Sequence, residues 1–208
     1  ALGKAARATV QLGAIGFVIV WVLKSWWSTA GFVGVTLTVA SITAGRRLVP
    51  AGRWWYAGVP VTVASLPVGL GILASGLIPA TPISVVPVLG ILIGNAMTTS
   101  VLAGRRTLDA LSSRRGEFEA GLSIGLLRKD AALLVAKPDA ALALLPGLDQ
   151  TRTVGLVTLP GAFVGTLLGG ATPLQAAAVQ LMVLAALLLV QSVATLVTVH
   201  LIARDVLR

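Results

Sequence analysis

No cysteine occurs in the sequence, and charged residues are scarce. The absence of cysteine excludes disulfides and thiolate metal sites, and it leaves the redox compartment open. Only 11% of the 208 residues are charged, whereas 56% are hydrophobic, and the mean hydropathy is +0.95. Because a soluble domain carries about 25% charged residues, this composition indicates an integral membrane protein.

Motifs for catalysis are also missing. No G-x-x-x-x-G-K-[ST] phosphate-binding loop occurs, so ATP hydrolysis would have to come from another subunit. The centres of the apolar runs contain no Asp, Glu, Lys or Arg, although proton relays place ionisable groups there. We therefore expect no catalytic residue, no enzyme activity and no cofactor in this chain, and proton-driven transport is the weaker hypothesis.

The few charges that are present are unbalanced. Lys and Arg number 16 and Asp and Glu number 7, which gives a net charge of +9. Proteins that bind nucleic acid carry such charge on a basic face or stripe. Here the basic residues lie in short clusters between apolar runs. The expected partner is therefore the lipid bilayer and not nucleic acid.

Long apolar runs predict an all-α fold, a polytopic bundle of about six transmembrane helices in a single domain over residues 1–208. About 20 helical residues cross the hydrocarbon core. We place the spans at residues 9–23, 29–45, 55–77, 82–103, 153–170 and 174–202. Prolines inside membrane helices are tolerated, so four of them are expected to kink helices without ending them: Pro60, Pro67, Pro87 and Pro160.

The basic residues also predict the orientation, because cytoplasmic loops carry an excess of Lys and Arg. With a cytoplasmic amino terminus, all of the 16 basic residues except Lys24 fall on the inner side. Six crossings then place both termini in the cytoplasm. The outer loops, near 78–82 and 170–173, are nearly chargeless and too short for an extracellular domain.

The charged segment 104–152 is expected to be cytoplasmic. Its first part suits the end of a long helix, where Arg105 and Asp109 are spaced to form an ion pair. Gly125 then interrupts the helical pattern, and an amphipathic pattern resumes over 126–137. Such an element either presents one face to a partner or lies on anionic lipid, and the pattern alone does not choose between them.

Residues 119–138 read EAGLSIGLLRKDAALLVAKP, with a Gly six residues after the Glu and a Pro thirteen after that Gly. This spacing resembles the coupling loop of ABC-transporter permeases, with Gly121 in place of the second Ala and Lys137 in place of a Leu. The resemblance implies contact with an ATP-binding subunit through six residues: Glu119, Ala120, Gly121, Gly125, Arg128 and Pro138.

Two longer strings, PISVVPVLGILIGNAMT (82–98) and TVGLVTLPGAFVGTLLGGATPLQAAAVQLMV (153–183), resemble the Fet-type, YbbM-like (FetB-like) family of ABC permeases. The likeness runs from ARATVQL (6–12) to the end of the chain. Members of that family are associated with iron export in bacteria, and plant relatives with aluminium tolerance. Family members usually have a further helix before the ARATVQL-like segment, so an additional amino-terminal helix is expected to be missing here or dispensable.

The resemblance implies a permease subunit in the bacterial plasma (inner) membrane, most simply a homodimer, driven by ATP and Mg²⁺ in a partner subunit. The implied function is export of a metal ion such as iron, or of a small metal-related solute. The rival hypothesis is a membrane scaffold that recruits a cytoplasmic partner and transports nothing. The residues reveal neither the substrate nor the direction of transport.

Polar side chains inside the spans are candidates for a translocation pathway, because unpaired polar groups are costly in hydrocarbon. The candidates are Gln11, Asn95, Met97, Thr98 and Gln180, with Gln191 as a further amide. The alternative is that these amides join helices to one another. Whether the chain has a metal site stays open: His, Cys and carboxylates are nearly absent from the spans, so a transported metal would pass as a complex or bind at the cytoplasmic mouth. His200 is interpreted as an interfacial residue and not as a ligand.

Two further groups have both a functional and a structural interpretation. Asp149 and Arg152 precede the predicted fifth span and are either a solvated helix entry or a cytoplasmic gate. Glycines at four-residue spacing permit a close helix crossing, and we predict helix packing at Gly90, Gly94, Gly161, Gly165 and Gly169.

Overall fold

The computed structural model describes residues 22, 25–48, 54–76, 78–155 and 159–204. Every regular element among them is a helix, which confirms the predicted all-helical class. The predicted span over 9–23 and the candidate Gln11 fall outside these residues, except for Val22.

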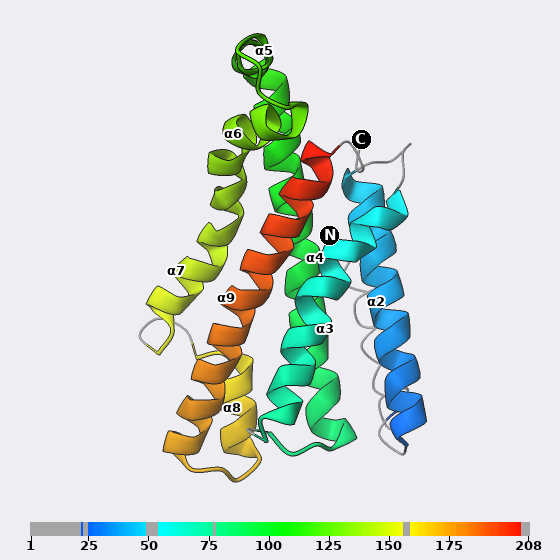
Figure 1. Ribbon diagram of the computed structural model, residues 1–208. Coiled ribbons are helices and arrows are strands. Elements are labelled where there is room, and N and C mark those ends of the chain that lie inside the picture. Colours follow the sequence, from blue (N-terminus) through cyan, green and yellow to red (C-terminus); the bar gives the residue numbers. More distant parts are fainter. Residues whose placement is uncertain (1–21, 23–24, 49–53, 77, 156–158, 205–208) are drawn as a thin grey trace, which may run out of the picture.

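The elements follow one another as a succession of helices, numbered as in Figure 1. The α-helices are α2 (Trp26–Leu48), α3 (Gly58–Ala74), α4 (Pro82–Ser113), α5 (Arg115–Ser123), α6 (Arg128–Ala141), α7 (Leu145–Thr153), α8 (Gly161–Leu168) and α9 (Pro173–Ala203). Two short 3₁₀ turns, η1 (Trp54–Ala57) and η2 (Leu142–Leu144), precede α3 and α7.

Helices α4 and α9 form the centre of the bundle. They pack against each other, and both also contact α3 and α6. Small residues allow this close packing: Ala64, Ala96 and Ala194 have no exposed surface. At Gly69 and Gly104 an added Cβ would collide with Leu89 and Leu48 respectively, so these two glycines set the approach of α3 and α2 to α4.

Five stretches of the described residues are long and apolar enough to cross a membrane. Four of them match predicted spans, at Trp26–Leu48, Trp55–Ala74, Pro82–Ser113 and Pro173–Ala203. The fifth, Arg128–Thr153, lies, apart from its last residue, in the segment 104–152 that was predicted to be cytoplasmic. Its helix α6 packs against both α4 and α9, because the alanines Ala131, Ala132 and Ala136 bury one face.

The prediction of one continuous span over 153–170 is wrong. Helix α7 ends at Thr153, Gly155 adopts a positive φ of 80°, and α8 begins only at Gly161. Pro160 precedes α8 in an extended conformation and so marks a helix boundary, whereas Pro67 and Pro87 lie inside α3 and α4 as predicted. In Figure 1, α6, α7 and α8 follow one another toward the end of the bundle opposite α5.

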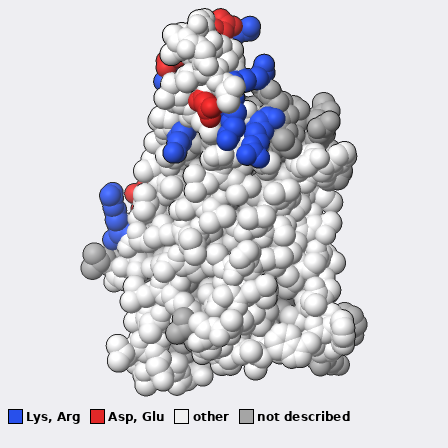
Figure 2. Space-filling model, viewed as in Figure 1, with Lys and Arg blue, Asp and Glu red and all other residues white. Residues whose placement is uncertain are grey.

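Charge is concentrated at one end of the molecule. In Figure 2 basic and acidic side chains gather at the end that carries α5, and the described residues on this face show no charged side chain at the opposite end, which we call the uncharged end. A further charged group lies over α7, the helix that contains Asp149 and Arg152. The uncharged end is closed by a tight turn, where Gly170 has φ 91° and Thr172 and Gln175 form a capping box at the start of α9.

Candidate functional site

The charged end carries a projecting structure, which we call the cap and define as residues 114–138. It comprises α5, a turn and the first part of α6, and α5 lies beyond the ends of the other helices in Figure 1. The cap contains all six residues predicted to contact an ATP-binding subunit, namely Glu119, Ala120, Gly121, Gly125, Arg128 and Pro138.

Arg114, the residue between α4 and α5, holds the cap together. Its Nε donates to Glu117 Oε1 at 2.8 Å, and its Nη1 donates to the Val135 carbonyl at 3.0 Å and to Asp139 at 3.3 Å. The hydrogen bond from Arg114 lowers the pKa of Glu117, and the hydrogen bond to Glu117 raises the pKa of Arg114. One guanidinium therefore ties α4, α5 and α6 together.

Gly125 ends α5 through its conformation. It has φ 90°, a value that favours glycine. Its N–H donates to the Leu122 carbonyl at 3.0 Å, and the Leu126 N–H donates to the Gly121 carbonyl at 3.1 Å. This pair of bonds is a Schellman motif. The predicted glycine turn between two helices is thus confirmed.

Gly121 has a packing role inside the cap. It is buried, and an added Cβ would lie 3.2 Å from Ala131 Cβ and 3.4 Å from Leu126 Cδ1. Helix α5 therefore approaches α6 more closely here than an alanine would allow without adjustment. This contact gives a physical reason for glycine at the position where the coupling-loop pattern has alanine.

The outward face of the cap combines aliphatic and charged groups. Ile124 is 81% exposed and Leu127 is 72% exposed, and both belong to the turn after α5. Glu119 accepts from Arg115 at 2.8 Å, with both side chains largely exposed. Ala120, Arg128 and Pro138 are also exposed. The guanidinium carbon of Arg128 lies 5.9 Å from the ring centre of Phe118. Exposed aliphatic groups ringed by charge are typical of a docking surface.

Two amides meet in the interior of the bundle. Gln191 of α9 donates to Asn95 Oδ1 at 3.2 Å, and Asn95 donates to the Ile91 carbonyl at 3.0 Å. Gly147 of α7 lies against this pair, because an added Cβ would collide with Gln191 Oε1. That oxygen has no hydrogen-bond partner among the described residues. The pair joins α4 to α9, as the helix-joining interpretation of Asn95 requires.

The other pathway candidates lie apart from this pair. Gln180 is 5% exposed, and its side-chain oxygen has no partner in the described part of the chain. It is eleven residues before Gln191, which is about three helical turns, so both amides lie on one face of α9. Thr98 donates to the Gly94 carbonyl of its own helix, and Met97 packs against the core.

The two residues of the candidate gate do not pair with each other. Asp149 and Arg152 are both exposed on α7, and neither belongs to the ion pairs that Arg114 and Arg115 form in the described part of the chain. The predicted pair between Arg105 and Asp109 is likewise not formed. In Figure 1, α7 lies well away from α5 along the bundle.

The predicted packing glycines are not in close contact within the chain. An added Cβ would meet nothing within 4 Å at Gly90, Gly94, Gly161 or Gly165, and Gly169 follows the end of α8. Close approach occurs instead at Gly58, Gly69, Gly104 and Gly147. Four-residue spacing was therefore a poor guide, because the neighbouring helix decides which glycine is crowded.

Three functional candidates were missed at the sequence level. Arg114 was counted only as a positive charge, Gly147 was not considered, and Ile124 was not singled out. For metal binding, no group of three His, Cys, Asp or Glu side chains occurs in the described residues.

Comparison with known proteins gives one family. The chain matches the uncharacterised protein family UPF0014 over residues 2–207. It is 33% identical over 206 residues to the UPF0014 membrane protein STAR2 of Oryza sativa subsp. japonica, which covers 94% of this chain and 70% of STAR2. It is 32% identical over 183 residues to the protein ALUMINUM SENSITIVE 3 of Arabidopsis thaliana, covering 86% of this chain and 66% of that protein.

A bacterial relative bears on the resemblance noted from the sequence. The chain is 27% identical over 208 residues to the "Probable iron export permease protein FetB" of Escherichia coli (strain K12), covering 98% of this chain and 80% of FetB. No solved structure matches the chain. The resemblance to Fet-type permeases is confirmed, and the chain belongs to the UPF0014 family of membrane proteins.

Proposed function

We propose that this chain is the permease subunit of an ABC transporter and that an ATP-binding subunit docks on the cap. The observation that carries the proposal is the pair of exposed aliphatic residues, Ile124 and Leu127, on a glycine turn that Arg114 fastens to the bundle. Because α4 and α6 both continue from the cap into the bundle, a force applied at the cap reaches the helices directly.

The orientation supports the same function. The cap lies at the basic end of the molecule, which the positive-inside rule assigns to the cytoplasm. ATP and Mg²⁺ would be bound by the partner, and the plasma membrane of a bacterial cell is the expected location. Glu119 and Arg115 would contribute charge at the rim of the contact, where ion pairs are worth little individually.

The substrate is proposed from a relative's name and from the interior. FetB is named as a probable iron export permease, so a metal ion or a small metal-containing solute is the expected cargo. The buried side-chain oxygens of Gln180 and Gln191 have no partner among the described residues, and such neutral groups suit a complexed metal better than a naked transition-metal ion. Export is the proposed direction.

Two copies are proposed for the working unit. Gly94 and Thr98 lie on a strip of α4 where an added side chain at Gly94 would meet nothing in the chain, and Thr98 is exposed. Because the sequence has no cysteine, Thr98→Cys can be cross-linked cleanly in membranes. Dimer formation supports the proposal, and a monomer under conditions that preserve ATPase activity contradicts it.

The coupling proposal is tested by Ile124→Ser, with Leu174→Ser as the matched control. Ile124 and Leu174 are each 81% exposed, but Leu174 lies in the first turn of α9 at the uncharged end. Loss of a central aliphatic contact weakens a protein interface by about tenfold. Ile124→Ser should therefore lower retention of the ATP-binding subunit and its substrate-stimulated activity, whereas Leu174→Ser should not. Equal retention in both variants would overturn the docking site, and tight binding without transport would favour the scaffold.

A further inference from the structure

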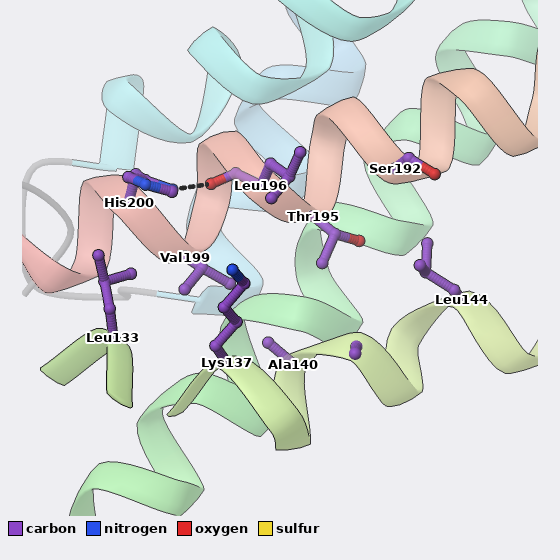
Figure 3. Close-up of a pocket in the computed structure, with 10 residues that line it drawn as sticks. Leu133, Lys137, Ala140, Leu144, Ser192, Thr195, Leu196, Val199 and His200 are labelled. Atoms are coloured by element: carbon purple, nitrogen blue, oxygen red, sulfur yellow. Dashed lines mark hydrogen bonds between the residues drawn. The ribbon is translucent and has the colours of Figure 1, made fainter. Parts of the chain in front are cut away.

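A groove between α6 and α9 remains without a role. Leu133, Ala140 and Leu144 line it on the side of α6 and η2, and α9 forms the opposite wall (Figure 3). The partly enclosed space measures about 210 Å³. For comparison, an apolar protein cavity of about 150 Å³ takes up a benzene molecule. The groove is therefore large enough for part of an apolar ligand.

The chemistry of the groove excludes a metal ion. Six of its ten lining residues are aliphatic, His200 is the one metal-ligating side chain among them, and Lys137 is the charged residue. In Figure 3 the Lys137 side chain extends from α6 across the groove toward α9. A cationic group on an aliphatic wall repels metal ions and attracts an anion attached to an apolar tail.

Lys137 lies near the charged end of the bundle, where the head group of a bound lipid is expected. Asp139, two residues further along α6, is bonded to Arg114 at the charged end of α4. Lys137 takes part in none of the ion pairs formed by the described residues. An adjacent hollow shares Leu196 and His200 with the groove and reaches Arg204, so a second cation lies on the same stretch of α9.

Thr195 supplies an independent sign of a ligand. Its side chain lines the groove, is 6% exposed, and its hydroxyl has no hydrogen-bond partner in the described part of the chain. A buried hydroxyl without a partner is unfavourable. An ester carbonyl located between a phosphate and an acyl chain would accept from it.

We propose that the groove binds one anionic phospholipid from the surrounding bilayer. One acyl chain lies on Ala140, Ala141 and Leu144, the ester carbonyl accepts from Thr195, and the phosphate pairs with Lys137. The proposal rests on the chain being in a membrane and not on the proposed docking of an ATP-binding subunit. Leu133 and Lys137 belong to the cap, but they line the groove beside α9.

The test is native mass spectrometry of the full chain titrated with phosphatidylglycerol or phosphatidylcholine. The parent should bind one molecule of phosphatidylglycerol, and bind it more tightly than phosphatidylcholine. Lys137→Gln should weaken it by about fivefold, the contribution of one basic residue at an anionic membrane surface. Lys137→Arg should retain it, and Lys129→Gln, which removes a cation from the cap outside the groove, should have no effect. Equal losses in Lys137→Gln and Lys129→Gln would overturn the proposal.

Two further variants separate the acyl chain from the head group. Ala141→Phe places a ring in the groove from an exposed position. It should abolish binding of either lipid in the groove, because the acyl chain no longer fits. Thr195→Val should weaken ester-linked phosphatidylglycerol and leave its ether-linked analogue unchanged. Displacement of the lipid by millimolar inorganic phosphate, or equal effects of Thr195→Val on both linkages, would contradict a phospholipid site.

Discussion

At the scale of single residues, the role of a glycine in this chain depends on which side chains lie next to it. Gly147 leaves space for the Gln191 amide, and that amide bonds to Asn95. By contrast Gly161 has nothing within 4 Å of an added Cβ. The sequence shows both simply as glycines in apolar runs, so their different roles could not be predicted without knowing which helix lies opposite.

Gly147→Ala should destabilise the protein by about 1–3 kcal/mol, the usual cost of overpacking a buried contact. The added methyl group would displace Gln191 and disturb its bond to Asn95. Thermal unfolding in detergent measures the loss, and Gly161→Ala should be nearly neutral. Combining Gly147→Ala with Gln191→Ala should recover part of the stability lost at Gly147, since the two sites are in contact. Strict additivity would show that the clash is not the cause.

Glu117 makes the cap sensitive to acid. Its pKa is lowered from the ordinary value of 4.5, chiefly by the hydrogen bond from Arg114. A carboxyl whose pKa is lower in the folded than in the unfolded state stabilises the fold above the unfolded pKa. That contribution is lost as the pH falls through the folded value.

Glu117→Gln should therefore loosen the cap at neutral pH but make little difference well below pH 4.5. Hydrogen exchange of residues 114–126, corrected for the intrinsic rate at each pH, measures this directly. The parent and the variant should differ at pH 7 and converge on acidification. A difference that persists at all pH values would mean that Glu117 acts through its shape and not its charge.

At the scale of elements, the pattern of residues predicted the helix–turn–helix of the cap well, but it predicted the course of α6, α7 and α8 poorly. Gly125 interrupts a helical pattern, and the structure ends α5 there. Over 126–137 the amphipathic pattern predicted an element that presents one face to a partner or lies on lipid, but the alanines of α6 bury one face against α4 and α9. The break between α7 and α8 was missed because hydropathy continues across Gly155 and Pro160 without interruption.

Arg114→Gln should detach α5 from α6 while leaving the bundle folded. The variant loses the bonds to Glu117, Asp139 and the Val135 carbonyl together, so the cap should become more susceptible to proteolysis at the turn after Ser123. Arg115→Gln is the matched control, because it removes only an exposed pair with Glu119. If the two variants are cleaved at the same rate, the bridging role of Arg114 is refuted.

At the scale of the whole molecule, composition and charge determine most of what could be predicted. The low charge content predicted membrane helices, and the clustered basic residues predicted one charged end, which Figure 2 shows. Neither property specifies side-chain partners such as Asn95 and Gln191, since these depend on how α4 and α9 pack. The number and placement of charges likewise could not predict the path of α6, α7 and α8 along the bundle.

The orientation can be tested with two single cysteines in this cysteine-free sequence. Ser113 is exposed at the charged end of α4, and Leu174 is 81% exposed at the uncharged end; Leu174 is preferable to Thr172, whose side chain caps α9. A membrane-impermeant maleimide added to intact cells should label Leu174→Cys, whereas Ser113→Cys should react only after the membrane is opened. The reason is the excess of Lys and Arg around Ser113, which the positive-inside rule assigns to the cytoplasm. Labelling of Ser113→Cys in intact cells would show that the orientation is the reverse of the proposed one. The cap would then be out of reach of any cytoplasmic ATPase.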